Sequence, residues 1–211
     1  MGLAVEVGAL SFLLDNDNEG AEWLEKSLVE LNECLIQHHL EPHNEPKRLP
    51  ELGSRCELIS FPYSWTHYLR RVVAYVMTEK NWQAVPLAED EDPTLDDTLQ
   101  SESHELRSHF ICHSDAEGFY VPQKFTEILF GADTIAGDGI IGSSYQLLEE
   151  MIMVAPTLGI SLSNGKLSDE QARKLNDTPE EDPLMIEKLV WLSFYEAARL
   201  SIENKTLIVF Q

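Results

Sequence analysis

Apolar residues recur at intervals of three and four in three long stretches of the chain. This spacing places them on one face of an α-helix, so helices are predicted over residues 19–39, 62–80 and 182–203. The last stretch is apolar on nearly every side, yet its apolar run is shorter than the ~18 residues that a membrane span needs. Such a helix is typical of the centre of a protein core.

Serine residues mark the start of two shorter helices. Ser143 or Ser144 precedes a helical pattern that runs to about Val154. Ser168 opens a capping box before a helix that ends near Asn176. Because a serine hydroxyl satisfies one of the first free amide groups of a helix, both helices are predicted to begin at these positions.

Four short segments have the composition of strands: residues 55–60, 108–114, 118–122 and 206–210. In 108–114 apolar and polar positions alternate, which puts one set of side chains on each face of a strand. The apolar run over residues 2–14 also has strand character at its start, but it is too uniform to distinguish a strand from a helix.

The mixture of these elements predicts the fold class. Long helices with a few short strands, in no regular βαβ alternation, are typical of an α+β fold. We expect a mostly helical single domain over residues 1–211, with a central buried C-terminal helix. The acidic segment 88–105 (AEDEDPTLDDTLQSESHE) is predicted to be an exposed, mobile loop, and it could also separate the N-terminal helical part from the rest.

Acidic residues outnumber basic ones by more than two to one. The chain has 37 Asp and Glu against 15 Lys and Arg, a formal net charge of −22. Nucleic-acid binding relies on Lys and Arg to neutralise phosphates, and an anionic membrane would repel this chain, so neither partner is expected. A basic protein would be attracted to it, although solubility alone also accounts for such a charge.

The cysteines and the N-terminus predict a cytoplasmic protein. Cys34, Cys56 and Cys112 are odd in number and form no C-x-x-C pair, which is typical of a reducing compartment. The N-terminal run lacks a basic region and contains Glu6, unlike a secretory signal.

The densest group of ligand-type side chains lies between His109 and Tyr120. His109, His113 and Asp115 are candidate metal ligands, because zinc, manganese or iron accept such side chains. On a strand, however, residues four apart are separated by about 13 Å and cannot chelate one ion directly. The alternative is a plain strand that ends in a turn at Ser114–Gly118.

The same region carries a resemblance. The segment His113-Ser-Asp-Ala-Glu-Gly-Phe-Tyr-Val-Pro122, followed by Gly142-Ser-Ser-Tyr-Gln-Leu-Leu-Glu-Glu150, resembles a group of bacterial hypothetical proteins. The first segment covers less than a tenth of the chain. The resemblance implies no activity and transfers no catalytic residue.

A glycine-rich segment matches a nucleotide-binding pattern only in part. Gly137-Asp-Gly139-Ile-Ile-Gly142 fits G-x-G-x-x-G. The dinucleotide site also needs a preceding strand and an acidic residue about 20 positions later, and the sequence supplies neither. A flexible turn followed by a serine cap explains the segment, so no cofactor is predicted.

Two functions are compatible with these patterns. The first is a non-enzymatic binding protein of an inhibitory, immunity type, directed at a basic protein. Its candidate surface comes from the acidic segment and the turn that follows: Glu89, Asp90, Glu91, Asp92, Asp96, Asp97, Glu117 and Tyr120. The second is a metal-dependent hydrolase that uses His109, His113 and Asp115. The patterns specify neither catalytic residues nor an oligomeric state.

Overall fold

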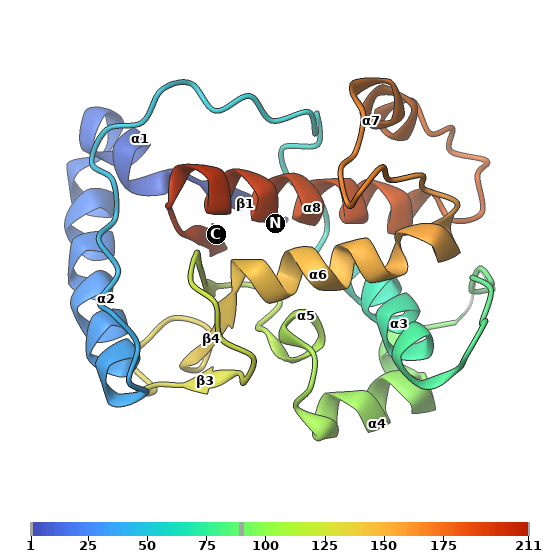
Figure 1. Cartoon of the computed structure of the whole chain (residues 1–211), viewed down its shortest axis with the longest axis horizontal. Coiled ribbons are helices and arrows are strands. Elements are labelled where there is room, and N and C mark those ends of the chain that lie inside the picture. Colours follow the sequence, from blue (N-terminus) through green and yellow to red (C-terminus); the bar gives the residue numbers. More distant parts are fainter. Residues whose placement is uncertain (1, 89–90, 211) are drawn as a thin grey trace.

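A small mixed sheet lies between two groups of helices in the computed structural model, which describes residues 2–88 and 91–210 (Figure 1). Its strands are β1 Val5–Val7, β2 Gly118–Val121, β3 Leu129–Phe130, β4 Ile140–Ser143 and β5 Ile208–Phe210. Their order across the sheet is β1-β5-β2-β4-β3. β2 and β4 are parallel, and the other neighbouring pairs are antiparallel. The first and last strands of the chain therefore lie side by side.

The helices gather on the two faces of this sheet. They are α1 Ala9–Asn16, α2 Asn18–Gln37, α3 Trp65–Thr78, α4 Asp97–Glu105, α5 His109–Cys112, α6 Ser144–Val154, α7 Asp169–Asn176 and α8 Met185–Asn204, with 3₁₀ turns η1 Pro93–Leu95 and η2 Ala155–Leu158. α1 and α2 cover one face, and α3, α6 and α8 pack on the other (Figure 1). Within the described residues, no helix combines the length and apolar character needed to cross a bilayer.

The alternation of side chains along β2 explains this division. Phe119 and Val121 are buried in the core beneath α1 and α2. Tyr120, between them, is buried in the core formed with α3, α6 and α8. Because successive side chains of a strand point to opposite faces, one short strand contributes to both cores.

α8 lies at the centre of the larger group of helices, where it packs along α6 and α3 (Figure 1). Trp191 and Phe194 are fully buried in this core. The indole Nε1 of Trp191 donates to the Met151 carbonyl of α6 at 2.7 Å, so the buried polar atom is satisfied. The predicted α+β class and the central, buried C-terminal helix are confirmed.

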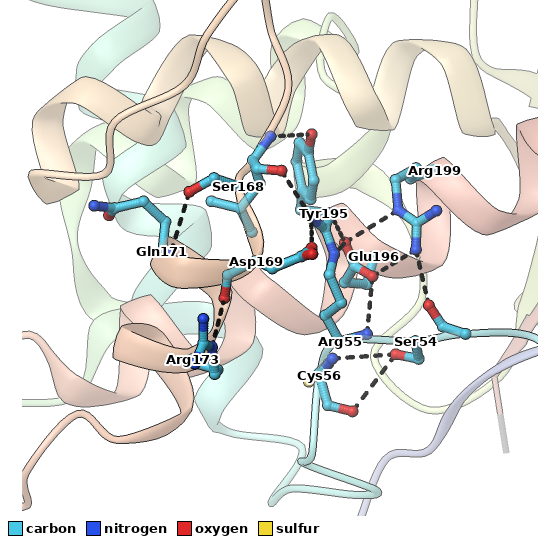
Figure 2. A network of polar contacts seen from close by, with 12 residues as sticks. Ser54, Arg55, Cys56, Ser168, Asp169, Gln171, Arg173, Tyr195, Glu196 and Arg199 are labelled. Atoms are coloured by element: carbon cyan, nitrogen blue, oxygen red, sulfur yellow. Dashed lines mark hydrogen bonds and ion pairs between the residues drawn. The ribbon is translucent and has the colours of Figure 1, made fainter.

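A buried charge network joins α8 to the segment that precedes α3 (Figure 2). Glu196, only 1% exposed, accepts hydrogen bonds from Arg55 and Arg199. Arg55 also donates to Asp169, at the start of α7, at 3.3 Å. Removal of Glu196 would take this shared partner from both arginines, so the network holds this segment against both helices.

The strand predicted over residues 55–60 is absent from the structure. The side chain of Asn176 donates to the Arg55 carbonyl at 2.7 Å and accepts from the Glu57 amide at 3.1 Å. These backbone groups bond to a side chain of α7 rather than to a neighbouring strand, so the segment is extended but belongs to no sheet.

The strand predicted over residues 108–114 is also wrong, because residues 109–112 form the helical turn α5. The Ser108 hydroxyl accepts from the Ile111 amide at 3.0 Å. The carboxylate of Glu150, from α6, accepts from the amides of His109 at 2.7 Å and Phe110 at 3.1 Å. These acceptors satisfy the first free amides of the turn, and one of them comes from a distant segment.

The prediction of a loop over residues 88–105 is wrong for its second half. η1 and α4 occupy residues 93–95 and 97–105. The carboxylate of Asp92 accepts from the Thr94 amide, and that of Asp96 accepts from the amides of Thr98 and Leu99. The acidic composition that predicted a loop therefore includes the caps of these helices.

Candidate protein-binding surface

A row of glutamates follows the outward face of α2: Glu19, Glu22, Glu30 and Glu33. Three are exposed, and Glu30 is partly exposed. At 3.6 residues per turn their spacing places them on one side, opposite the buried leucines of the helix. The row, called the α2 row below, extends over about 21 Å at ~1.5 Å per residue.

The carboxylates of the α2 row form no ion pair within the described residues. Within residues 2–88 and 91–210, no Lys, Arg or His nitrogen lies within 4.0 Å of its carboxylates, and the α2 carboxylate that does pair is Glu25, with Lys47 at 2.6 Å. Lys26, the one basic residue of this helix, lies four residues from both Glu22 and Glu30 and therefore on the same side, but it forms no ion pair with either carboxylate. Val29 and Ile36, which are 59% and 56% exposed, flank the row with apolar surface. Helix α2 therefore presents both charge and apolar contact to a partner.

Three of the acidic residues predicted to form the binding surface, Glu91, Asp92 and Asp96, have other contacts within the protein. Glu89 and Asp90 lie outside the described residues. Glu91 accepts from the Ala88 amide at 3.1 Å, and Asp92 accepts from both the amide and the hydroxyl of Thr94.

Further along this segment, Asp96 caps α4 and pairs with Arg71 at 2.9 Å. Asp97 is exposed in the first turn of α4, and Glu117 is exposed in the turn before β2. Tyr120 is fully buried, and its hydroxyl donates to the His109 carbonyl at 3.0 Å. The prediction that Tyr120 belongs to a binding surface is therefore wrong.

The structure does not bring His109, His113 and Asp115 together as ligands. His109 Nδ1 accepts from the Ser143 amide at 3.0 Å, so the proton sits on Nε2, which donates to the Thr126 carbonyl at 3.2 Å. The two ring nitrogens of His113 lie 3.1 and 3.2 Å from backbone carbonyls.

Burial lowers the pKa of His109, and it lowers the pKa of His113 to about 4. Within the described part of the chain, no set of three or more His, Cys, Asp or Glu side chains has the geometry to hold a metal ion. Both imidazoles instead act as buried, neutral structural groups.

A comparison with protein-family models gives one match. The family described as "Putative DNA-mimic protein" matches residues 1–210. The chain belongs to this family. A comparison with curated proteins found no match, and a comparison with solved structures found none.

In this member of the family, α4 and the turn after α5 meet at a cleft of about 480 Å³. Asp115 lies in it and pairs with Arg70 and with His67, whose Nε2 is 3.0 Å from the carboxylate. Partial burial raises the pKa of Asp115, but the hydrogen bond from His67 and the charge of Arg70 outweigh it and bring the pKa to about 2. The charge of Asp115 is thus compensated within the cleft, whose lining also includes Asp138.

Cys112 also lines that cleft. Burial raises the pKa of its thiol. The thiol therefore stays protonated near neutral pH, unlike an activated cysteine nucleophile, whose pKa is lowered. The cleft therefore offers no activated cysteine nucleophile at Cys112.

The α2 row was missed at the level of sequence, although the signal was present. The helix was assigned from its apolar positions alone, and its glutamates lie on the opposite side at intervals of three and eight. Only the fold shows that these carboxylates remain unpaired, because the cations that neutralise other acidic residues come from distant segments.

Proposed function

We propose that this protein binds a DNA-binding protein by presenting carboxylates where DNA presents phosphates, and so occupies the DNA site of that partner. Membership of a DNA-mimic family and the net charge of −22 support this function. The observation that carries it is the unpaired α2 row, because carboxylates free of internal cations are available to the Lys and Arg residues of a DNA-binding surface.

The density of charge on α2 is comparable with that of DNA, though lower. One strand of B-DNA carries a phosphate about every 3.4 Å of helix axis. The α2 row carries one unpaired carboxylate about every 7 Å on average, because its four charges are separated by three intervals over about 21 Å. The helix therefore reproduces about half of the charge density of one strand, and other acidic residues must supply the rest.

Such a protein inhibits its partner without chemistry. The negative field of the chain accelerates encounter with a basic surface, and the rate falls as salt screens the charges. Direct competition with DNA then follows from shared contacts. This is an inhibitory role of the immunity type, with a DNA-binding protein as the basic partner.

The test is capture and competition. Immobilised protein is incubated with a lysate at low salt, bound proteins are identified, and each is assayed for binding to duplex DNA. We expect a captured protein whose DNA complex is displaced by stoichiometric amounts of this chain. Failure to capture any DNA-binding protein, or capture that duplex DNA does not compete away, would contradict the proposal.

A matched pair of variants locates the surface. Glu19, Glu22, Glu30 and Glu33 are changed to Gln in one variant. In the control, Glu170, Asp177, Glu180 and Glu181 are changed to the corresponding amides, which removes the same charge from exposed positions in and after α7, remote from α2 (Figure 1). The first variant should lose competition with DNA, and the second should retain it.

A further inference from the structure

A second acidic feature lies beside the N-terminal end of α2, in a cleft of about 460 Å³. Its walls come from distant segments: Leu13, Asp17, Trp23, Tyr63, Glu117 and Phe210. The volume is within the ~300–1,000 Å³ typical of sites for small ligands. Aromatic and apolar side chains form its body, and two carboxylates lie among them.

The aromatic walls are held in place from behind. Trp23 is 45% exposed and stacks on the buried ring of Phe119, with centroids 6.3 Å apart. Phe210 is 2% exposed and packs against the rings of His113 at 4.6 Å and Phe194 at 5.7 Å. The open face of Trp23 is thus a rigid surface on which a flat group can stack.

The two carboxylates are available to a ligand. One oxygen of Asp17 caps α2 by accepting from the amides of Glu19 and Gly20, both at 3.1 Å. Glu117 is exposed in the turn before β2. Within the described residues, neither carboxylate lies within 4.0 Å of a cationic side chain, and no Lys, Arg or His lines this cleft.

Two larger clefts differ in this respect. The cleft at α4 contains Arg70 and His67 beside Asp115. The cleft of about 600 Å³ near α7 contains Arg55 and Arg199, whose charges are met by Glu196 (Figure 2). The cleft beside α2 combines an aromatic wall with negative charge that the protein itself does not neutralise.

We infer that this cleft binds an arginine side chain of the partner. A guanidinium stacks on an indole face by cation–π attraction and donates paired hydrogen bonds to carboxylates, whereas an ammonium is more strongly hydrated and lacks the planar fork. The cleft adjoins the α2 row, so one basic surface can contact both. The inference rests on the proposed function and assigns it an anchor, the contact that fixes the register of the complex.

The direct test uses N-acetyl-L-arginine amide as the probe. Its binding is followed by the indole NH signal of Trp23 in ¹H–¹⁵N spectra, assigned with Trp23→Phe. We expect saturable shifts of that signal. N-acetyl-L-citrulline amide, which has the shape of the probe without its charge, should give none. Equal shifts with citrulline, or no shift with arginine, would overturn the inference.

Two double variants distinguish arginine binding in this cleft from a contribution of the α2 row. Asp17→Asn preserves the helix cap, because Asn and Asp cap equally well, and Glu117→Gln alters an exposed position. The double variant should weaken arginine binding at least about tenfold, at an unchanged Tm. Glu30→Gln with Glu33→Gln is the control and should leave probe binding unchanged. Equal weakening by both pairs would show a diffuse field effect and sink the assignment.

A lysine probe tests whether the cleft prefers a guanidinium to an ammonium group. N-acetyl-L-lysine amide should bind several-fold more weakly than the arginine probe. Equal affinity would overturn the assignment of a guanidinium site.

The partner complex distinguishes the two proposals. If neutralising the α2 row abolishes DNA competition while the Asp17→Asn, Glu117→Gln variant competes as well as the wild type, the anchor is wrong and the proposed function stands. If no DNA-binding partner is captured but the arginine probe binds, the proposed function fails and the cleft remains a cation site.

Discussion

The carboxylates of α2 and those of residues 91–105 occupy similar stretches of acidic sequence but have different surroundings. In 91–105, Asp92 and Asp96 cap helices, Asp96 also pairs with Arg71, and the buried Glu102 pairs with Arg107. The carboxylates of the α2 row have no such partner within the described residues. An acidic residue that is already paired inside its own protein has little charge left for another. The comparison teaches that a row of unpaired charge, rather than acidic content, marks a surface for a basic partner.

The largest effect should come from reversing charge in the two regions. Glu30→Lys with Glu33→Lys should weaken the partner complex about 100-fold or more, because two attractions become repulsions at the interface. Asp97→Lys with Glu105→Lys reverses two exposed charges of α4 that form no ion pair within the described residues but lie outside the α2 row, and it should weaken the complex less than about threefold. Titration calorimetry with the captured partner measures both. Equal losses would mean that net charge alone governs binding, and the comparison would fail.

An intermediate effect is expected on stability. Asp96→Ala removes the cap of α4 and the partner of Arg71, and should lower the free energy of unfolding by about 1–2 kcal/mol in urea titrations. Asp97→Ala, one residue on and exposed, should change it by less than about 0.5 kcal/mol. Competition with DNA should survive both substitutions. An Asp96→Ala protein of unaltered stability would show that this carboxylate is as free as those of the α2 row.

A pH-dependent effect on stability concerns Glu150, the carboxylate that caps α5. Burial raises its pKa to about 7, although the Ser108 hydroxyl and the amides of Phe110 and His109 act in the opposite direction. A carboxyl with a raised folded-state pKa binds its proton more tightly when folded. Its contribution to stability is therefore full below about pH 4.5 and is lost as the pH rises to about 7.

Thermal unfolding between pH 4.5 and 7.5 checks this titration. Glu150→Gln cannot titrate, so its Tm should fall less steeply than that of the wild type over this range, by a difference of a few degrees. Parallel curves would mean that Glu150 is ionised throughout and acts purely as an acceptor for the α5 amides.

Local patterns predicted the elements whose type is set by neighbouring residues in the sequence. The periods of α2, α3 and α8, the serine caps at Ser143 and Ser168, and the strand β5 are found close to the predicted residues. Where a distant group intervened, the predictions failed. Glu150 turns residues 109–112 into a helix, and Asn176 binds the backbone of the segment that was expected to be a strand.

By itself, the amino-acid sequence determined the large excess of acid, the long amphipathic helices and the buried C-terminal helix, because these depend on composition and on repeats within a few turns. It could not determine which carboxylates stay unpaired, since Arg55 and Arg71 meet their acidic partners only after folding. Nor could it reveal a cleft whose walls lie in α2, the turn before β2, and β5. Ion pairs such as these and the walls of the cleft are formed by contacts between distant segments, and those contacts exist only in the tertiary structure.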